Sequence, residues 1–206
     1  MEINMEELAS DDYRFEIKYQ IPLQNKELIL QKCIENKFIK EYPNRMIHSI
    51  YFDDFQNNAL YDSLNGLYQR KKIRLRKYNS NSNGRLEEKI KTDQMNKKNI
   101  RIINQVPDFE NYTSLFEFIR QEYPIKNLIP ASRVSYLREY FINKESNVRI
   151  TLDSQIRTKD FKTNIHKILL DSFILEIKSE KIPSILNLNF GIQTRFSKYC
   201  YSRQDE

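Results

Sequence analysis

The stretch LYQRKKIRLRKYNSNSNGRLEEKIK, residues 67–91, decides the fold expected for this chain. Side chains of a β-strand alternate between two faces, so residues two apart share one face of the sheet. Residues 67–78 therefore place four cations together, namely Arg70, Lys72, Arg74 and Arg76. Ile73 and Leu75 take the opposite face. The polar turn NSNSNG follows, and its Asn83-Gly84 pair predicts a hairpin whose returning strand is residues 85–91.

The same alternation recurs in the other strands predicted along the chain. The charged faces carry Arg14, Glu16 and Lys18 in residues 13–21, then Glu87, Lys89 and Lys91, then Arg149, Thr151 and Asp153, and finally Glu176 and Lys178. A single strand of this kind is typical of a half-buried sheet with a solvated outer face. Five such strands favour a shared charged surface, because like charges on neighbouring strands repel by about 0.2–1 kcal/mol per pair. We therefore expect an anion to compensate these cations.

Length and pattern predict one domain. A chain of 206 residues with 39% hydrophobic residues can bury one substantial core, so we expect a flexible acidic arm at residues 1–11 and a single domain at 12–206. Further strands are expected at 46–53, 99–106, 132–142 and near Arg195, with helices after Asn25, at 55–65, from a capping box of Ser114 and Glu117, and from Pro183. This order indicates an α+β fold built on an antiparallel barrel or a strongly curved sheet, with helices covering its apolar side.

The amino-acid composition narrows the range of functions expected for the chain. With 34 Lys and Arg against 28 Asp and Glu, the formal charge is +6, which favours a polyanionic partner: nucleic acid, a membrane surface or free polyphosphate. Only three glycines are present, which excludes a P-loop and a GxGxxG fingerprint, so phosphate binding must rely on charged side chains. Two histidines are too few for a zinc site. The sequence lacks a signal-peptide pattern and an apolar run of membrane-spanning length, so we expect a cytoplasmic protein with no transmembrane segment, while a membrane-protein partner stays open.

Segments of the chain resemble, in order, the VTC domain, which is the polyphosphate polymerase branch of the triphosphate tunnel metalloenzymes. They are YRFEIKY (13–19), RLRKY (74–78), LEEKIK (86–91), SYLREYF (135–141), RITLD (149–153), LEIKSE (175–180) and RFSKY (195–199). Arg14 stands where the wider superfamily has the first glutamate of Glu-x-Glu-x-Lys, and this departure fits the VTC branch. The resemblance implies a closed eight-stranded antiparallel β-barrel with a polar, basic interior and short helices packed outside.

The resemblance also implies roles for individual residues. The catalytic positions that would grip the donor phosphates are Arg74, Arg76, Arg138 and Arg149, although a salt bridge at the rim is an alternative for Arg138. The positions that would line the path of the chain are Lys18, Lys89, Lys91, Lys178, Arg195 and Lys198. Glu176 would hold Mn²⁺ or Mg²⁺. Glu16, Glu87 and Asp153 are either further metal ligands or neutralising partners of adjacent cations.

The implied activity is transfer of the γ-phosphoryl group of ATP to a growing inorganic polyphosphate, so ATP and polyphosphate are the expected partners and nucleic acid is not. The acceptor is already an anion, so alignment and charge neutralisation suffice without a strong general base. Two alternatives stay open. A tripolyphosphatase or nucleoside triphosphatase would use the same tunnel, and a non-catalytic module would bind polyphosphate or nucleic acid through its charge and its aromatic residues.

Overall fold

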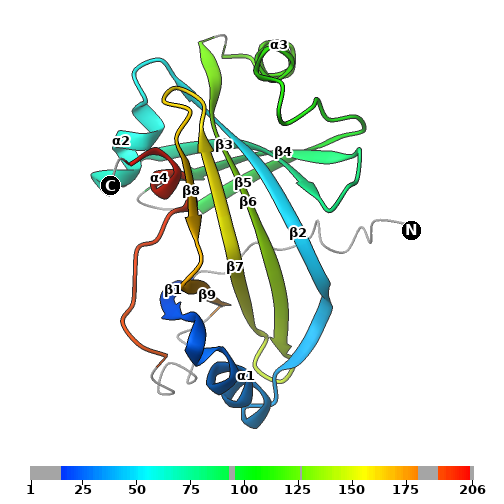
Figure 1. Ribbon diagram of the computed structural model, residues 1–206, viewed down its shortest axis with the longest axis vertical. Coiled ribbons are helices and arrows are strands. Elements are labelled where there is room, and N and C mark those ends of the chain that lie inside the picture. Colours follow the sequence, from blue (N-terminus) through cyan, green and yellow to red (C-terminus); the bar gives the residue numbers. More distant parts are fainter. Residues whose placement is uncertain (1–14, 93–95, 126, 181–189, 205–206) are drawn as a thin grey trace.

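The computed structural model describes residues 15–92, 96–125, 127–180 and 190–204 (Figure 1). Its strands are β1 Phe15–Pro22, β2 Ile39–Asp54, β3 Arg70–Tyr78, β4 Gly84–Lys91, β5 Asn96–Ile103, β6 Leu128–Asn143, β7 Val148–Asp160, β8 His166–Leu169 and β9 Ser172–Ser179. Its helices are the 3₁₀ helix η2 Leu23–Asn25, α1 Lys26–Glu35, α2 Asn58–Leu64, α3 Tyr112–Glu122 and α4 Lys198–Arg203. The predicted acidic arm at 1–11 and the helix predicted from Pro183 lie outside the described residues.

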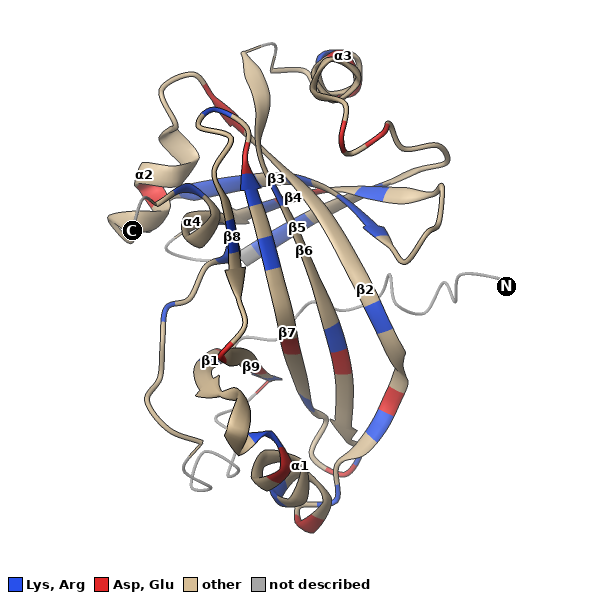
Figure 2. Cartoon of the chain, in the orientation of Figure 1, with Lys and Arg blue, Asp and Glu red and all other residues tan. Residues whose placement is uncertain are grey.

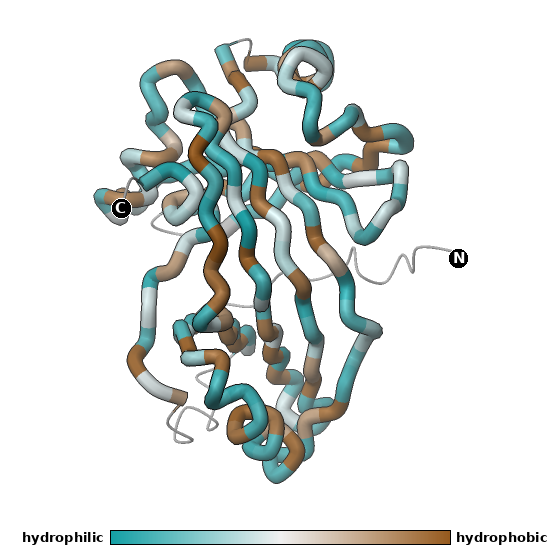
Figure 3. Tube along the Cα trace, viewed as in Figure 1, coloured by the Kyte–Doolittle hydropathy of each residue, from teal (hydrophilic) through white to brown (hydrophobic). Residues whose placement is uncertain are grey.

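All of the described strands join one antiparallel sheet. Eight of them follow the order β1-β9-β7-β6-β2-β3-β4-β5, and β8 pairs with β7 beside this path. In Figure 1, β3, β4 and β5 cross the long strands β2, β6 and β7 at the top of the molecule. Brown and white segments interrupt the teal along these strands in Figure 3, as expected for strands with one apolar and one polar face.

Hydrogen bonds do not close this sheet among the described residues, so the closed eight-stranded barrel predicted from the resemblance is not confirmed. The strands at the two ends of the main path are β1 and β5, and β5 carries Lys97 and Lys98, as is typical of edge strands that avoid further pairing. The two ends of the sheet nevertheless meet through side chains, because Lys89 of β4 donates a hydrogen bond of 3.1 Å to Glu16 of β1. The sheet is therefore curved enough to bring the charged faces of its first and seventh strands together.

The apolar face of the sheet is covered by helices, as the sequence predicted. Helix α1 buries Ile29 and Cys33 against aliphatic and aromatic side chains of β1, β7 and β9. Burial raises the pKa of the Cys33 thiol to about 11, so this cysteine is an inert core residue. Both cysteines are free and buried, in agreement with the expectation of unpaired thiols.

Helix α3 covers β3, β4 and β5 in the same way, through the fully buried Leu115 and Ile119. It begins earlier than its predicted capping box of Ser114 and Glu117. The N-cap is Asn111, whose side-chain oxygen accepts a hydrogen bond of 3.1 Å from the backbone N–H of Ser114. Asparagine is as good an N-cap as serine, and here it starts the helix three residues before Ser114.

The hairpin between β3 and β4 forms as predicted, but the Asn83-Gly84 pair is not its turn. Gly84 is the first residue of β4, and the left-handed residue of the connection is Asn79, with φ 50°. A Cβ at Gly84 would lie 2.4 Å from Cγ1 of Val106 and 2.7 Å from the carbonyl oxygen of Arg76. Glycine is needed there for close packing of neighbouring chain segments.

The strand predicted near Arg195 is wrong. Only Gln193 makes an isolated bridge, to Tyr19 of β1, and the chain then enters α4 at Lys198. Ser197 caps this helix by accepting a hydrogen bond from the N–H of Cys200 at 3.3 Å. Unlike α1 and α3, α4 packs on the charged side of the sheet, where the ring of Tyr199 stacks on that of Tyr51 with centroids 5.0 Å apart.

Candidate functional site

The charged side chains of the curved sheet lie on one face, which we call the cationic face. Cross-strand register places on it Glu16 and Lys18 of β1, Arg45 of β2, Lys72, Arg74 and Arg76 of β3, Arg85, Glu87 and Lys89 of β4, Arg138 of β6, Arg149 and Asp153 of β7, and Glu176 and Lys178 of β9. Figure 2 shows the corresponding blue and red bands along these strands. The periodic pattern of the sequence thus produces one surface built from seven strands.

Two arginines of β3 share a buried carboxylate. Nε of Arg74 donates to Oε2 of Glu87 at 2.7 Å, and Nη1 of Arg76 lies 3.5 Å from Oε1 of the same group. Burial opposes ionisation of the Glu87 carboxyl, but the charges of Arg74 and Arg76 outweigh it and hold its pKa well below the ordinary value. Arg74 also donates to the hydroxyl of Tyr51 at 3.4 Å. A cluster of two guanidinium groups and one carboxylate keeps a net positive charge.

A third arginine is fixed on β6. The Arg138 guanidinium makes two hydrogen bonds to Asp153, and Lys198 of α4 contacts the same carboxylate. The fully buried Asp153 is held ionised against its desolvation, because Arg138 and Lys198 lower its pKa. Nη2 of Arg138 lies 3.6 Å from Oε2 of Glu176. The ring of Tyr136 lies below both cations, with its centroid 4.5 Å from Nζ of Lys198.

A third group of charges joins β1, β4 and β9. Nζ of Lys18 lies 2.8 Å from one oxygen of Glu16, and Lys89 bonds to the other oxygen. Lys178 lies 3.8 Å from Oε1 of Glu176. Burial disfavours the charged form of Lys18, but Glu176 and Glu16 more than offset it and raise the pKa of this ammonium group above its ordinary value. Cations and carboxylates therefore alternate across this end of the sheet.

Three predicted positions remain. Arg149 of β7 lies on the cationic face, directly opposite Lys178 in the β7–β9 pairing, and its Nη2 is 3.5 Å from Glu41 of β2, in a side chain that is 34% exposed. Lys91 is the last residue of β4, opposite Arg70. Arg195 is exposed, and its Nη1 lies 3.7 Å from the position that a Cβ on Gly66 would occupy, beside the end of α2. The structure thus brings eight predicted cations onto one face, namely Lys18, Arg74, Arg76, Lys89, Arg138, Arg149, Lys178 and Lys198. Lys91 lies at the end of its strand, and Arg195 lies beside the end of α2.

Comparison with known proteins agrees with this geometry. The family model of the VTC domain matches residues 13–205. The chain belongs to the VTC domain family. Solved structures of the triphosphate tunnel type resemble it in fold. One is a putative adenylyl cyclase from Hippeastrum described as having a dominant triphosphatase activity, with 14% identity, a TM-score of 0.51, and coverage of 84% of this chain and 82% of that one.

Another similar structure is a protein from Pyrococcus horikoshii, with 16% identity, a TM-score of 0.50, and coverage of 89% of this chain and 95% of that one. At these identities the likeness concerns the fold. Comparison with curated protein sequences gave no significant match. Within the described part of this VTC domain, no helix has the length and apolar character needed to cross a bilayer.

Glu176 is the carboxylate of this VTC domain best suited to a metal ion. Triphosphate tunnel metalloenzymes use divalent metal ions. The described residues contain no cluster of three or more His, Cys, Asp and Glu side chains that would hold a metal alone. Mg²⁺ commonly uses one or two carboxylates together with waters and substrate phosphates, so such a cluster is not required.

The contacts of Glu176 fit that role. Despite its burial, Lys178 and Lys18 hold its pKa well below the ordinary value, so it is ionised, and its ion contacts at 3.6 and 3.8 Å are longer than hydrogen bonds. By contrast, Asp153 and Glu87 accept short hydrogen bonds from arginines. Glu16 lies close enough to Glu176 for their charges to interact. The negative charge of Glu176 opposes ionisation of the Glu16 carboxyl, but Lys18, Lys89 and Lys178 outweigh it and lower the pKa of Glu16. Glu176, with Glu16 nearby, is the position we would assign to a metal.

Some residues of the cationic face were missed by sequence reasoning. Arg45 of β2 lies opposite Arg138. Tyr136 is uncharged and belongs to no conspicuous motif, yet its ring lies under two cations, Arg138 and Lys198. Lys72 of β3 was expected on the charged face, but its contact with α4 was not: it donates a hydrogen bond of 3.1 Å to the hydroxyl of Ser197 at the start of that helix. Ser197 belongs to the segment RFSKY, in which the sequence analysis singled out the neighbouring Arg195 and Lys198. The place of Ser197 at the start of a helix, and not in a strand, was not predictable from strand alternation.

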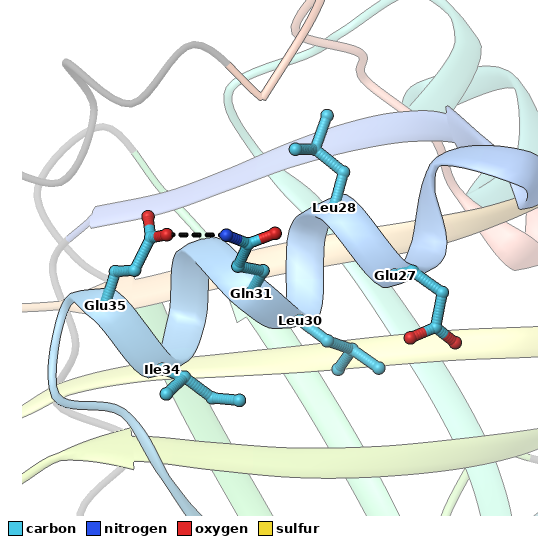
Figure 4. Close-up of a pocket in the computed structure, with 6 residues that line it drawn as sticks. All are labelled: Glu27, Leu28, Leu30, Gln31, Ile34 and Glu35. Atoms are coloured by element: carbon cyan, nitrogen blue, oxygen red, sulfur yellow. Dashed lines mark hydrogen bonds between the residues drawn. The ribbon is translucent and has the colours of Figure 1, made fainter.

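A shallow hollow beside α1 is not part of this site (Figure 4). Its lining consists of two carboxylates, one amide and three aliphatic side chains, namely Glu27, Glu35, Gln31, Leu28, Leu30 and Ile34. Helix α1 covers the apolar side of the sheet, so the hollow is separate from the cationic face. Its carboxylates would repel a polyphosphate.

Proposed function

We propose that this protein is a metal-dependent phosphotransferase that moves the γ-phosphoryl group of ATP to the end of an inorganic polyphosphate chain. The observation that carries the proposal is the convergence of Arg74, Arg76 and Arg138 on one face. Arg76 donates a hydrogen bond of 3.5 Å to the hydroxyl of Tyr136, and the guanidinium carbon of Arg138 lies 5.3 Å from the centroid of the same ring, although the two arginines come from different strands. Such a concentration of fixed, partly buried guanidinium groups is suited to the triphosphate of a nucleotide.

The reaction requires little covalent chemistry from the protein. A terminal oxygen of the polyphosphate attacks the γ-phosphorus, a new P–O bond forms, and the bond between the γ-phosphorus and the bridging oxygen breaks, so ADP leaves with the electron pair. Arg74 and Arg76 would hold the donor phosphates from β3, and Arg138 would neutralise charge on the transferred group from β6. Lys18, Lys89 and Lys198 would hold the acceptor chain.

The anchoring carboxylates give these arginines fixed directions. Glu87 and Asp153 accept hydrogen bonds from Arg74 and Arg138, so the guanidinium groups are oriented before substrate binds. Glu176 would hold Mn²⁺ or Mg²⁺, which supplies neutralising charge between phosphate oxygens. The site thereby combines positioning with charge neutralisation, the two contributions that phosphoryl transfer needs.

Hydrolysis is the second candidate, favoured by the triphosphatase activity described for the similar structure from Hippeastrum. A water molecule in place of the polyphosphate end would release orthophosphate from the same bound triphosphate. The two reactions share every arginine named above and differ in the acceptor.

Product analysis tests both candidates. Purified protein is incubated with γ-labelled ATP and Mn²⁺ or Mg²⁺, with and without a polyphosphate primer, and the products are separated on a gel. We expect labelled long chains. Orthophosphate alone would identify the hydrolase, and metal-independent binding without any product would identify a binding module instead.

Matched variants connect the product to the cationic face. Arg74→Gln and Arg120→Gln each remove one guanidinium group, but Arg120 lies exposed on α3, on the apolar side of the sheet. We expect Arg74→Gln to abolish most turnover and Arg120→Gln to leave it near that of the unaltered protein. Equal activity in the two variants would remove Arg74 from the proposed machinery.

A further inference from the structure

The face of the sheet opposite to the cationic face carries a second group of cations, on β6, β7 and β8. Arg133 lies directly opposite Lys159 in the β6–β7 pairing, and Lys159 lies directly opposite His166 in the β7–β8 pairing. Two residues earlier on β7, Arg157 lies opposite Ile168. We call these five residues the outer patch.

Strand alternation separates the outer patch from the cationic face. The residues of β7 that alternate with its cations are the buried Ile156 and Thr158. Ile156 packs with Tyr136, whose ring belongs to the cationic face, so Arg157 and Lys159 point to the other side of the sheet. Arg157 is exposed and Lys159 is half-buried. The outer patch is therefore open to solvent and away from the proposed reaction.

The charges of the outer patch are only partly compensated within the described residues. Arg133 forms an ion pair with Glu110, in the segment before α3, and the charge of Asp108 also acts on its guanidinium group. No carboxylate of the described residues forms an ion pair with Arg157 or Lys159. Like charges in directly opposed positions destabilise a sheet, so a bound anion would stabilise this part of it.

The contacts and spacing of these cations indicate which anion suits them. The anion that already pairs with Arg133 is the carboxylate of Glu110, in a side chain that is 62% exposed. Arg157 and Lys159 are two residues apart on one strand, which separates them by about 6.6 Å along it. Carboxylates at every second position of an extended polypeptide have the same spacing. The pattern therefore fits an acidic polypeptide better than a single phosphate group.

Strand β8 offers an edge to which such a polypeptide can add. It pairs with β7 and, within the described part of the chain, with no other strand. An edge strand presents backbone N–H and C=O groups on its free side, where an extended segment can continue the sheet. Ile168 is 50% and Leu170 is 63% exposed beside this edge. Lys167 points to the other face, where it donates a hydrogen bond of 3.5 Å to the carbonyl oxygen of Tyr201.

We propose that the outer patch docks an extended acidic segment of a partner protein, which adds to the free edge of β8 and directs carboxylates of alternate residues toward His166, Lys159 and Arg157. The added strand would lie about 9.6 Å from β7, a gap that a lysine or arginine and a glutamate span together. An apolar residue of the segment would cover Ile168. This inference goes beyond the proposed function, because the outer patch takes no part in phosphoryl transfer.

Binding of model peptides tests the docking surface. The probe is a short peptide with glutamate at every second position and threonine or valine between, and the reference peptide has glutamine in place of each glutamate. Dissociation constants are measured by fluorescence anisotropy on the unaltered full chain, on Arg157→Gln, on Lys159→Gln and on the double variant. We expect each single substitution to weaken binding of the glutamate peptide roughly two- to fivefold, and the double substitution roughly tenfold.

A lysine of the opposite face provides the matched control. Lys89→Gln also removes one ammonium group from a strand of the same sheet, at a side chain that is 51% exposed on the cationic face. It should leave the affinity for the glutamate peptide unchanged. Equal affinities for the glutamate and glutamine peptides would overturn the proposal. So would a loss in Lys89→Gln as large as the loss in Lys159→Gln, because the peptide would then bind without preference for the outer patch.

Two further measurements separate this surface from other roles. Sedimentation with vesicles of phosphatidylcholine and phosphatidylglycerol tests a bilayer as the partner. Binding to these vesicles that is lost in the double variant, without binding of the glutamate peptide, would overturn the polypeptide partner. Turnover of the double variant, folded by circular dichroism, should equal that of the unaltered protein. A loss of turnover would overturn the separation of the outer patch from the reaction.

Discussion

The Arg138 guanidinium donates two hydrogen bonds to the Asp153 carboxylate, from Nε to Oδ1 at 2.6 Å and from Nη2 to Oδ2 at 2.7 Å. Asp153 is fully buried and also contacts Lys198, so both of its oxygens are engaged by cations of the face. Among the described residues, Glu176, one strand away on β9, has longer ion contacts, at 3.6 Å to Arg138 and 3.8 Å to Lys178. We therefore predict different roles for the two carboxylates: Asp153 would position Arg138, and Glu176 would bind the metal.

Substituting Asp153→Asn should lower stability and turnover without changing the metal requirement. The amide keeps the shape but accepts only one of the two hydrogen bonds, which leaves a buried donor unsatisfied at a cost of about 1–3 kcal/mol. A protein of this size then melts roughly 2–4 °C lower for each kcal/mol lost. Thermal unfolding and a metal titration of turnover check this, and a large rise in the metal concentration for half-maximal rate would make Asp153 a ligand instead.

Substituting Glu176→Gln should, unlike Asp153→Asn, change the metal requirement of turnover. Loss of the negative charge removes the group that would hold Mn²⁺ or Mg²⁺, so the metal concentration for half-maximal turnover should rise at least about tenfold. Asp153→Asn measured in parallel is the matched comparison, since it also replaces one carboxylate of the cationic face by an amide. Turnover of Glu176→Gln with an unchanged metal dependence would exclude Glu176 from the metal site.

Stability should depend on pH through Glu87. Its pKa lies below the ordinary value of 4.5 in the folded protein, because Arg74 and Arg76 outweigh its burial. The unfolded chain thus takes up this proton at a higher pH than the folded one, so the stabilisation is complete above about pH 4.5 and is lost as the pH falls further. The difference in unfolding free energy between the unaltered protein and Glu87→Gln should be large at pH 7 and shrink below pH 4.5.

Denaturant unfolding at pH 7, 5, 4 and 3 measures that difference. Glu117→Gln, on the exposed side of α3, controls for the removal of one carboxylate from the chain. A stability difference for Glu87→Gln that stayed constant from pH 7 to 3 would mean that the Glu87 carboxylate does not stabilise the folded state through its charge.

The cationic face was predictable because strand alternation is a local property. Arg74 and Arg76 share a face by their spacing alone, whereas the place of Arg138 beside them was implied by the family resemblance and is seen in the structure through their shared neighbour Tyr136. Closure of the sheet was not predictable in this way. Whether β1 pairs with β5 or merely touches β4 through Glu16 and Lys89 depends on the accumulated twist of eight strands, which no local pattern encodes.

Arg45 shows why part of the site escaped prediction. It follows Pro43 and Asn44, which are residues that disfavour a strand interior, so the strand was expected to begin at residue 46. In the structure, β2 begins at Ile39 and passes through this stretch with register shifts on both sides of Tyr42. A β-bulge tolerates proline because the bulged residue needs no backbone partner. Regular pairing of β2 with β6 resumes at Arg45, which lies opposite Arg138.

The last prediction concerns Gly84, whose role differs from the turn role expected of it. Its backbone conformation suits any residue, so alanine at this position would carry no backbone strain. The added Cβ would however lie 2.7 Å from the Arg76 carbonyl oxygen, an atom of the paired strand that cannot rotate away. We expect Gly84→Ala to lower the unfolding free energy by about 1–3 kcal/mol, as other overpacked sites do. Ser80→Ala, at an exposed position of the same connection, should have little effect in the same thermal melts.

The turnover of Gly84→Ala carries a second expectation. Arg76 pairs with the chain segment that begins at Gly84, so displacing that segment also displaces Arg76, one of the arginines proposed to hold the donor phosphates. Activity measured well below the melting temperature should therefore fall together with stability. A variant that melted at the original temperature and kept full activity would contradict both expectations. It would show that a shift of the Val106 side chain and its neighbours relieves the close approach at Gly84, and that the position of the start of β4 does not control the arginines of the cationic face.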